Sequence, residues 1–114
     1  MKLKLIVIRT QDLDNAVRFY SLLDLAFQYH QHHNSPFHYS TTINETVFEI
    51  YPLAKGQENA DKYTRFGFEV DDLQETIIRF QENNFHISES KQTEFGLIAI
   101  AIDPDGRKVE IYQK

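Results

Sequence analysis

The stretch Phe48-Glu49-Ile50-Tyr51 has a counterpart in Val109-Glu110-Ile111-Tyr112, at an offset of 61 residues. Both stretches place a glutamate between two apolar residues and a tyrosine two positions after the glutamate. Because alternate residues of a strand share a face, each stretch predicts a strand with apolar residues on one face and glutamate and tyrosine on the other. A match at a constant offset indicates an internally repeated fold.

Two predicted helices repeat in the same order as these strands. Residues at helical spacing match at an offset of 60. The matching pairs are Leu13 and Leu73, Ala16 and Thr76, Val17 and Ile77, and Tyr20 and Phe80. Asp12 and Asp72 precede the helices as N-caps, whose side-chain oxygens accept hydrogen bonds from the first turn. Asp24 and Asn84 are expected to close the helices, because both residue types tolerate the left-handed conformation.

The segments outside the helices alternate or are continuously apolar, which predicts strands. The expected strands cover residues 2–9, 25–32, 37–43, 46–52, 63–70, 85–89, 95–102 and 107–113. Each half of the chain then reads strand, helix, strand, strand, strand. The predicted fold class is α+β, with two tandem βαβββ modules that form a curved mixed sheet around a shared trough. The modules are expected at residues 1–56 and 57–114 of one structural domain.

The clearest turn in the chain is Asp103-Pro104-Asp105-Gly106. Its proline presets φ for the first central position, and its glycine can take the positive φ that closes the loop. The apolar segments 97–102 and 108–112 on either side predict a β-hairpin. The basic residues, Arg107 and Lys108 among them, are scattered and are expected to form solvated surface.

Composition excludes several classes of function. The 114 residues contain 12 basic and 17 acidic side chains, which gives a net charge of −5 and disfavours binding to nucleic acid. The chain has no cysteine, which excludes disulfides, thiolate zinc sites and a cysteine nucleophile. No apolar run approaches the roughly 20 residues that span a membrane. The start of the chain, MKLKLIVIRT, is not expected to be a signal peptide or an anchor, so the expected location is the cytoplasm.

Three segments are typical of one known family. They are the segment from Asp12-Leu13 to Phe19-Tyr20, the stretch Val70-Asp71-Asp72-Leu73, and the final stretch from Asp103 to Glu110. Together with the repeat, they make the chain similar over its whole length to the vicinal oxygen chelate superfamily. This is the group of glyoxalases, bleomycin-resistance proteins and extradiol dioxygenases. The resemblance implies the repeated βαβββ fold, but one scaffold of this kind supports many chemistries.

The resemblance also implies where a divalent ion binds in the metal-dependent members, through ligands on the first and fourth strands of each half. Two of these ligands are typically glutamates, and the matching residues here are Glu49 and Glu110. The other two are typically histidines, and the matching residues are Leu5 and Arg65. Arginine carries a permanent positive charge, and two carboxylates without imidazole make a weak site for a transition metal. We therefore expect no bound metal and no other cofactor.

The predicted open faces of the strands supply the candidate ligand-binding side chains. These candidates are Glu49, Tyr51, Arg65, Glu69, Glu110 and Tyr112. Two partly buried carboxylates repel each other, and a guanidinium between them relieves the repulsion through charge-assisted hydrogen bonds. We therefore expect Glu49, Glu110 or both to hold Arg65. The alternative interpretation is an ion cluster left by a degenerate site.

Four histidines lie close together in the sequence between residues 30 and 38. They are His30, His32, His33 and His38. His30 and His32 would share a strand face, a spacing that can bind a metal. The simpler interpretation is a solvated polar hairpin tip. The alternative is a role for His38 or His30 in recognising a ligand at the mouth of the trough.

The function expected from these observations is metal-free binding of a small molecule in the trough, as in the bleomycin-resistance members. The ligand itself is not identified by the sequence. The alternative is a lyase, isomerase or transferase of the glyoxalase type, metal-dependent or metal-free, with Glu49 or Glu110 as its catalytic base. A third hypothesis is a protein that keeps the fold for assembly alone. Small members of the family typically pair as homodimers, so a second copy of the chain is the expected partner.

Overall fold

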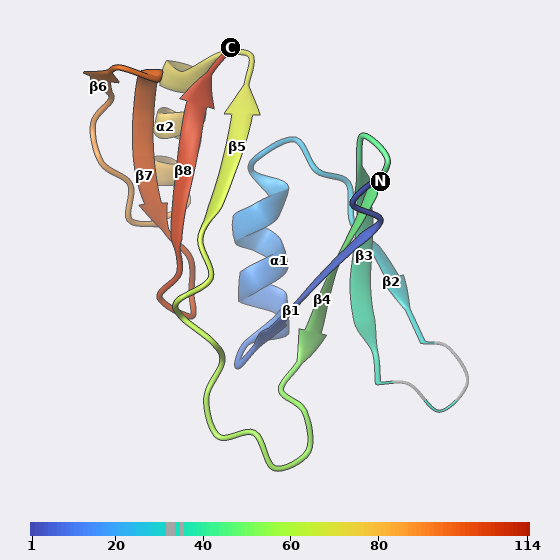
Figure 1. Cartoon of the computed structure of the whole chain (residues 1–114). Coiled ribbons are helices and arrows are strands. Elements are labelled where there is room, and N and C mark those ends of the chain that lie inside the picture. Colours follow the sequence, from blue (N-terminus) through green and yellow to red (C-terminus); the bar gives the residue numbers. More distant parts are fainter. Residues whose placement is uncertain (32–33, 35) are drawn as a thin grey trace. The chain divides into compact units, whose positions relative to one another are not determined.

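The computed structural model describes residues 1–31, 34 and 36–114, which fall into two compact units, Met1–Asp61 and Lys62–Lys114. The first unit contains strand β1 (Leu5–Thr10), helix α1 (Leu13–Ser21) and strands β2 (Gln28–His30), β3 (His38–Ile43) and β4 (Thr46–Pro52) (Figure 1). Its sheet has the order β1-β4-β3-β2. The β1–β4 pair is parallel, and the other two pairs are antiparallel.

The second unit repeats this arrangement strand for strand. It contains β5 (Phe66–Val70), helix α2 (Leu73–Glu82), β6 (Lys91–Thr93), β7 (Gly96–Ile102) and β8 (Lys108–Gln113). Its sheet has the order β5-β8-β7-β6, again with a parallel pair formed by the first and last strands. The predicted α+β fold of two βαβββ modules is confirmed. Neither α1 nor α2, the helices that the described residues form, has the length and apolar content needed to cross a membrane.

The helices begin where their N-capping residues predict, whereas α1 ends at Ser21, three residues before Asp24. The Asp12 side chain accepts a hydrogen bond from the Asn15 amide at 3.2 Å, and the Asp72 side chain accepts one from the Glu75 amide at 3.1 Å. Beyond the helix ends, Asp24 and Asn84 both have a φ of 62°, which is the left-handed conformation expected of them. The repeat in the sequence is therefore a repeat in local structure.

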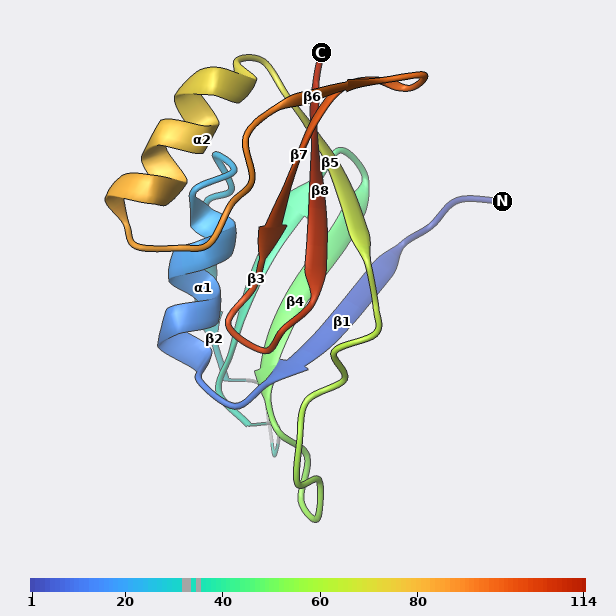
Figure 2. The ribbon, with the colours of Figure 1, turned by 90° about the vertical axis from the view of Figure 1, so that its left-hand side faces the viewer.

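Each helix covers one face of the sheet in its own unit. In Figure 2, α2 lies to one side of β5, β7 and β8. The apolar residues that flank the two glutamates face the helices, since Phe48, Ile50, Val109 and Ile111 are at most 1% exposed. In the first unit the Tyr20 ring packs edge-on against Phe48, with ring centroids 5.3 Å apart. The alternation therefore turns the two glutamates toward the faces that these helices do not cover.

One predicted strand is displaced. Residues 85–89 form only an isolated bridge between Ile87 and Ala101, and the strand lies instead at Lys91–Thr93. The cause is Ser88, whose hydroxyl oxygen accepts the Ile100 amide at 2.9 Å in the place of a backbone carbonyl. A side chain that takes over a ladder position interrupts the strand pairing. The fifth strand is also shorter than predicted, because it begins at Phe66 rather than at residue 63.

The expectation that Arg107 is solvated is wrong, because its side chain is 1% exposed. Its guanidinium donates to Asp103 at 3.1 Å and to Asp105 at 3.3 Å. The other oxygen of Asp103 accepts the backbone amides of Asp105 and Arg107, each at 2.9 Å. The β7–β8 turn, with Gly106 at a φ of 95°, therefore folds around one buried ion cluster. Burial is tolerated because both carboxylates neutralise the guanidinium.

The Asp103→Ala substitution is expected to destabilise the protein strongly. It leaves the Arg107 guanidinium with one carboxylate and removes the acceptor of two backbone amides, so the free energy of unfolding should fall by about 3–5 kcal/mol. Urea unfolding followed by circular dichroism measures this loss. The control is Asp71→Ala, which removes an exposed ion pair with Lys114 at 3.9 Å and should cost less than about 1 kcal/mol. Equal losses in the two variants would contradict the structural role of Asp103.

Candidate functional site

The candidate site of the second unit lies on the face of its sheet that α2 leaves open. The register places Ile98 beside Tyr112 and Ile100 beside Glu110, so these four side chains share that face. Strand β5 adds Gly67, which pairs with Glu110. The face therefore combines an apolar strand, β7, with a strand that carries a carboxylate and a phenol, β8.

Two donors hold the Glu110 carboxylate. The Arg65 guanidinium, just before β5, donates to Oε1, and the Tyr112 hydroxyl donates to Oε2 at 2.7 Å. The Glu110 side chain is 24% exposed, whereas that of Arg65 is 61% exposed. The predicted contact between Arg65 and a glutamate therefore forms within this unit, through Glu110. Each carboxylate oxygen keeps a lone pair for another donor, because a carboxylate offers about four acceptor positions.

These contacts shift the acid–base behaviour of both partners. The hydrogen bond from Tyr112 has the largest effect and lowers the pKa of Glu110 below 4.5. Burial opposes it as the second-largest effect, and the charge and the hydrogen bond of Arg65 each lower the pKa by less. The hydrogen bond between Tyr112 and Glu110 also raises the pKa of Tyr112 above 10.0. Glu110 is therefore held in its ionised form, and Tyr112 in its protonated form, at neutral pH.

Gly67 is a residue of this site to which the sequence analysis assigned no role. A Cβ atom at position 67 would lie 3.0 Å from Cε1 of the Tyr112 ring, which is closer than ordinary van der Waals contact. The missing side chain therefore leaves room for the ring that donates to Glu110. The signal in the sequence was a lone glycine inside a predicted strand, which often marks the close approach of another group.

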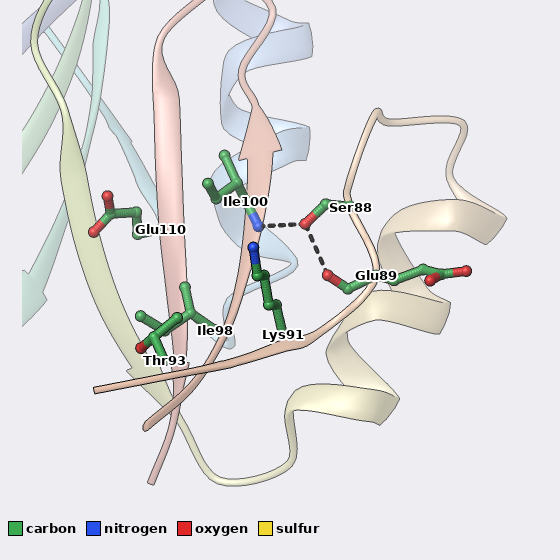
Figure 3. A pocket seen from close by; sticks show the side chains of 7 residues that line it. All are labelled: Ser88, Glu89, Lys91, Thr93, Ile98, Ile100 and Glu110. Carbon is green, nitrogen blue, oxygen red and sulfur yellow. Dashed lines mark hydrogen bonds between the residues drawn. The ribbon is translucent and has the colours of Figure 1, made fainter. Parts of the chain in front are cut away.

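A cavity of about 360 Å³ opens on the same face (Figure 3). Its lining residues are Ser88, Glu89, Lys91, Thr93, Ile98, Ile100 and Glu110. Ile98 and Ile100 form an apolar floor, and Glu110 lies at one side of it. The volume falls within the range of about 300–1,000 Å³ that is typical of small-molecule sites.

The first unit holds its glutamate differently. Oε2 of Glu49 lies 3.4 Å from Nε2 of His38, which is fully buried. The His38 ring stacks on Tyr51 with centroids 4.2 Å apart and planes within 5°, and the Arg9 guanidinium lies 4.8 Å from the centre of the Tyr51 ring. Nδ1 of His38 lies 3.1 Å from the carbonyl oxygen of Pro36, which can only accept, so Nδ1 carries a hydrogen. The predicted candidates His38, Glu49 and Tyr51 thus lie together.

The remaining candidates lie at the margins of these two clusters. Glu69 is on the exposed side of β5, where it pairs in register with Tyr112. His30 pairs with His38 across β2 and β3, with ring centroids 5.8 Å apart. His32 and His33 lie outside the described residues. Which of these side chains contact a ligand stays a prediction.

The donor groups do not fit the divalent ion of the metal-dependent members. Leu5 offers no donor atom, and Arg65 brings a fixed positive charge to the carboxylate of Glu110. Across residues 1–31, 34 and 36–114, no three histidine, aspartate or glutamate side chains converge into a group that could hold a metal ion.

Comparison with known proteins agrees with the observed fold. Residues 2–111 match the family described as the Glyoxalase/Bleomycin resistance protein/Dioxygenase superfamily. The chain belongs to this superfamily. A search of curated protein sequences gave no significant match.

Several solved structures share the fold. The antibiotic-binding protein TnmS3 from Streptomyces sp. CB03234 has a TM-score of 0.80 and 19% sequence identity, over 99% of this chain and 95% of its own. The oxidase ChaP-H2 has a TM-score of 0.78 and 18% identity, over 100% of this chain and 94% of its own. A glyoxalase I mutant from Zea mays has a TM-score of 0.81 and 19% identity, over 99% of this chain and 45% of its own. Binding proteins and enzymes thus share this architecture, and the fold does not separate them.

The Tyr112→Phe substitution should raise the pKa of Glu110, because it removes the largest cause of the lowering. Carbon-13 NMR of the side-chain carboxyl group measures this pKa directly. Arg65→Met should raise it too, because it removes both a charge and a hydrogen bond, and Glu82→Gln, on the exposed side of α2, should leave it unchanged.

The free energy of unfolding should depend on pH because the pKa of Glu110 differs between the folded and unfolded states. A carboxyl whose pKa is lowered by folding contributes stability above the unfolded value, 4.5 here, and loses it as the pH falls through the folded value. The stability difference between wild type and Tyr112→Phe should therefore be constant between about pH 5.5 and about pH 9 and shrink below about pH 4.5. It should also shrink above about pH 10, because folding raises the pKa of Tyr112 and the wild type loses this stability when the phenol ionises. A pKa of Glu110 that did not change in Tyr112→Phe would show that the hydrogen bond is absent in solution.

Proposed function

We propose that this protein is a metal-free member of the superfamily that binds a small organic molecule on the open face of its second sheet. The observation that carries the proposal is the ionised carboxylate of Glu110, held by Tyr112 and Arg65 at the side of a cavity with an apolar floor. A ligand with an apolar body and a cationic or other hydrogen-bond donor group matches such a cavity. The apolar part would lie on Ile98 and Ile100, and the donor would reach a remaining lone pair of Glu110.

The acid–base properties of Glu110 favour binding over catalysis. A general base works best when its pKa lies near the working pH, and lowering the pKa weakens it as a proton acceptor. The pKa of Glu110 is lowered by Tyr112 and Arg65, so the same contacts that make it a firm electrostatic anchor make it a poor base. The lowered pKa therefore weighs against the alternative of a glyoxalase-type lyase, isomerase or transferase that uses Glu110 as its catalytic base.

Two further points support the proposal. The antibiotic-binding protein TnmS3 shows that this fold serves in binding proteins as well as in enzymes. The contacts of Glu110 also come from neighbouring segments of one unit, so the carboxylate is oriented before any ligand arrives. Groups that are held in position in advance lose less conformational freedom on binding, which strengthens the affinity they provide.

The proposal predicts that ligand binding depends on Glu110. In a thermal-shift screen of antibiotics and cationic aromatic compounds, compounds that bind should raise the melting temperature by mass action. For these compounds, Glu110→Gln should raise the dissociation constant by about tenfold or more, because it removes a charge-assisted hydrogen bond. The matched control is Glu82→Gln, which makes the same charge change on the exposed side of α2 and should bind as wild type does. Equal affinity in wild type and Glu110→Gln would contradict the proposed role.

The proposal also predicts that the protein carries no stoichiometric metal at Glu49 and Glu110. The reason is the absence of imidazole at the positions of Leu5 and Arg65. Elemental analysis of untagged protein, purified without chelators, should find well below one zinc, nickel, manganese or iron ion per chain. A stoichiometric metal that disappeared in Glu110→Gln but not in Glu82→Gln would overturn this expectation.

The homodimer expected from the sequence stays a prediction. It is supported by apolar side chains that are exposed on the open faces of the two sheets, Leu5 at 52%, Val7 at 42% and Ile100 at 37%. Surfaces of this kind are often covered by a partner. Light scattering would distinguish a dimer from a monomer of 13.5 kDa.

A further inference from the structure

The cavity offers a ligand fewer polar groups than its lining suggests. The Thr93 hydroxyl donates to the Gly96 carbonyl at 2.8 Å and accepts the Phe95 amide at 3.0 Å. The Ser88 hydroxyl accepts the Ile100 amide at 2.9 Å and donates to the Glu89 carbonyl at 3.0 Å. Both hydroxyls are therefore already engaged with the backbone.

The two charged side chains from the 89–91 segment differ in direction. Figure 3 shows the Glu89 carboxylate pointing away from Ile98 and Ile100, whereas the Lys91 side chain points toward the cavity. Lys91 forms no ion pair within the part of the chain that the structure describes. Its ammonium group therefore has all three of its donors available. The polar groups that the cavity leaves for a ligand are Lys91 and Glu110.

The strand register separates these two charges across the apolar floor. Lys91 pairs with Ile98, and Glu110 pairs with Ile100, on opposite sides of β7. The spacing of strands and of residues along them places the two backbone positions about 12 Å apart. Both side chains rise from the same face of the sheet, because they pair directly with two residues of β7 that share that face. The cavity thus has an ammonium group at one end and an apolar middle, and at its other end a carboxylate that is paired with Arg65 outside the lining.

We propose that the cavity binds a zwitterionic small molecule, whose anionic group pairs with Lys91, whose apolar body lies on Ile98 and Ile100, and whose cationic group pairs with Glu110. The inference rests on the proposed function and names the ligand class for that same site. Lys91 selects the anionic end, which Glu110 alone would repel. Arg65 comes just before β5, which borders β8 on the side away from β7, so its hydrogen bond can keep the Glu110 carboxylate oriented while the remaining lone pairs receive the ligand.

The test uses three probes that share one aromatic ring. 4-(Aminomethyl)benzoate carries both charges at opposite ends of the ring, benzylamine carries the cation alone, and 4-methylbenzoate carries the anion alone. Dissociation constants come from NMR titration of the whole chain. In the wild-type protein the zwitterion should bind about tenfold or more tightly than either singly charged probe, since each charge-assisted contact adds to affinity.

The variants should show which charged group of the ligand each of the two side chains binds. Lys91→Met should weaken the zwitterion to the level of benzylamine and leave benzylamine unchanged, whereas Lys91→Arg should keep the preference for the zwitterion because it keeps the charge. Glu110→Gln should weaken the zwitterion and benzylamine. The control Lys114→Met, an exposed cation at the end of the chain, should bind all three probes as wild type does.

The experiment distinguishes a failure of the zwitterion proposal from a failure of the proposed function. If Lys91→Met binds the zwitterion as wild type does, while Glu110→Gln still weakens benzylamine, the zwitterion proposal is overturned and the proposed function stands. If neither benzylamine nor the zwitterion depends on Glu110, both are overturned. A preference for the zwitterion that persisted in Lys91→Met and in Glu110→Gln would place the binding elsewhere on the protein and would also overturn the inference.

Discussion

The parallel pairing of the first and last strands in each unit is the constraint on which the candidate site depends. In the second unit, this pairing puts Gly67 opposite Glu110 and Glu69 opposite Tyr112, although most of the unit lies between the two strands in sequence. Arg65, immediately before β5, reaches Glu110 because of this register. A shift of one residue would turn Glu110 into the apolar layer under α2. The same strand pairing therefore determines both the apolar layer under α2 and the contact between Arg65 and Glu110. A change of register would disturb both.

The two copies of the Glu-Ile-Tyr pattern lie on equivalent strands of the two units, but their side chains have different surroundings. In the second unit, the tyrosine after the glutamate donates its hydroxyl to the carboxylate. In the first unit, Tyr51 instead lies between the His38 ring and the Arg9 guanidinium, and His38 approaches Glu49. Tyr112 has the space for its hydrogen bond because Gly67 carries no side chain. A repeated sequence thus specifies a repeated fold but not a repeated site.

The alternation in Val109-Glu110-Ile111-Tyr112 was sufficient to predict which side chains leave the core, because strand periodicity alone decides the face. It did not predict the burial of His38, which depends on how the Tyr51 ring rotates and on a neighbouring strand. It also did not predict the burial of Arg107, which follows from the way the turn closes around Asp103. Contacts of these kinds depend on side-chain conformations and on chain segments whose pairing a linear pattern does not report. The fold was therefore more predictable than the site.

The glycine in β5 couples two positions that are distant in sequence. A Cβ atom at position 67 would lie 3.0 Å from the Tyr112 ring, so a side chain there requires the ring to move by a few tenths of an ångström. The first unit shows the other solution, with Val7 opposite Glu49 and a tyrosine whose ring stacks on His38. Among relatives of this protein, the residue at position 67 should therefore vary together with the residue at position 112. That joint variation would distinguish chains in which a tyrosine at position 112 donates a hydrogen bond to the glutamate at position 110 from chains that have lost this hydrogen bond.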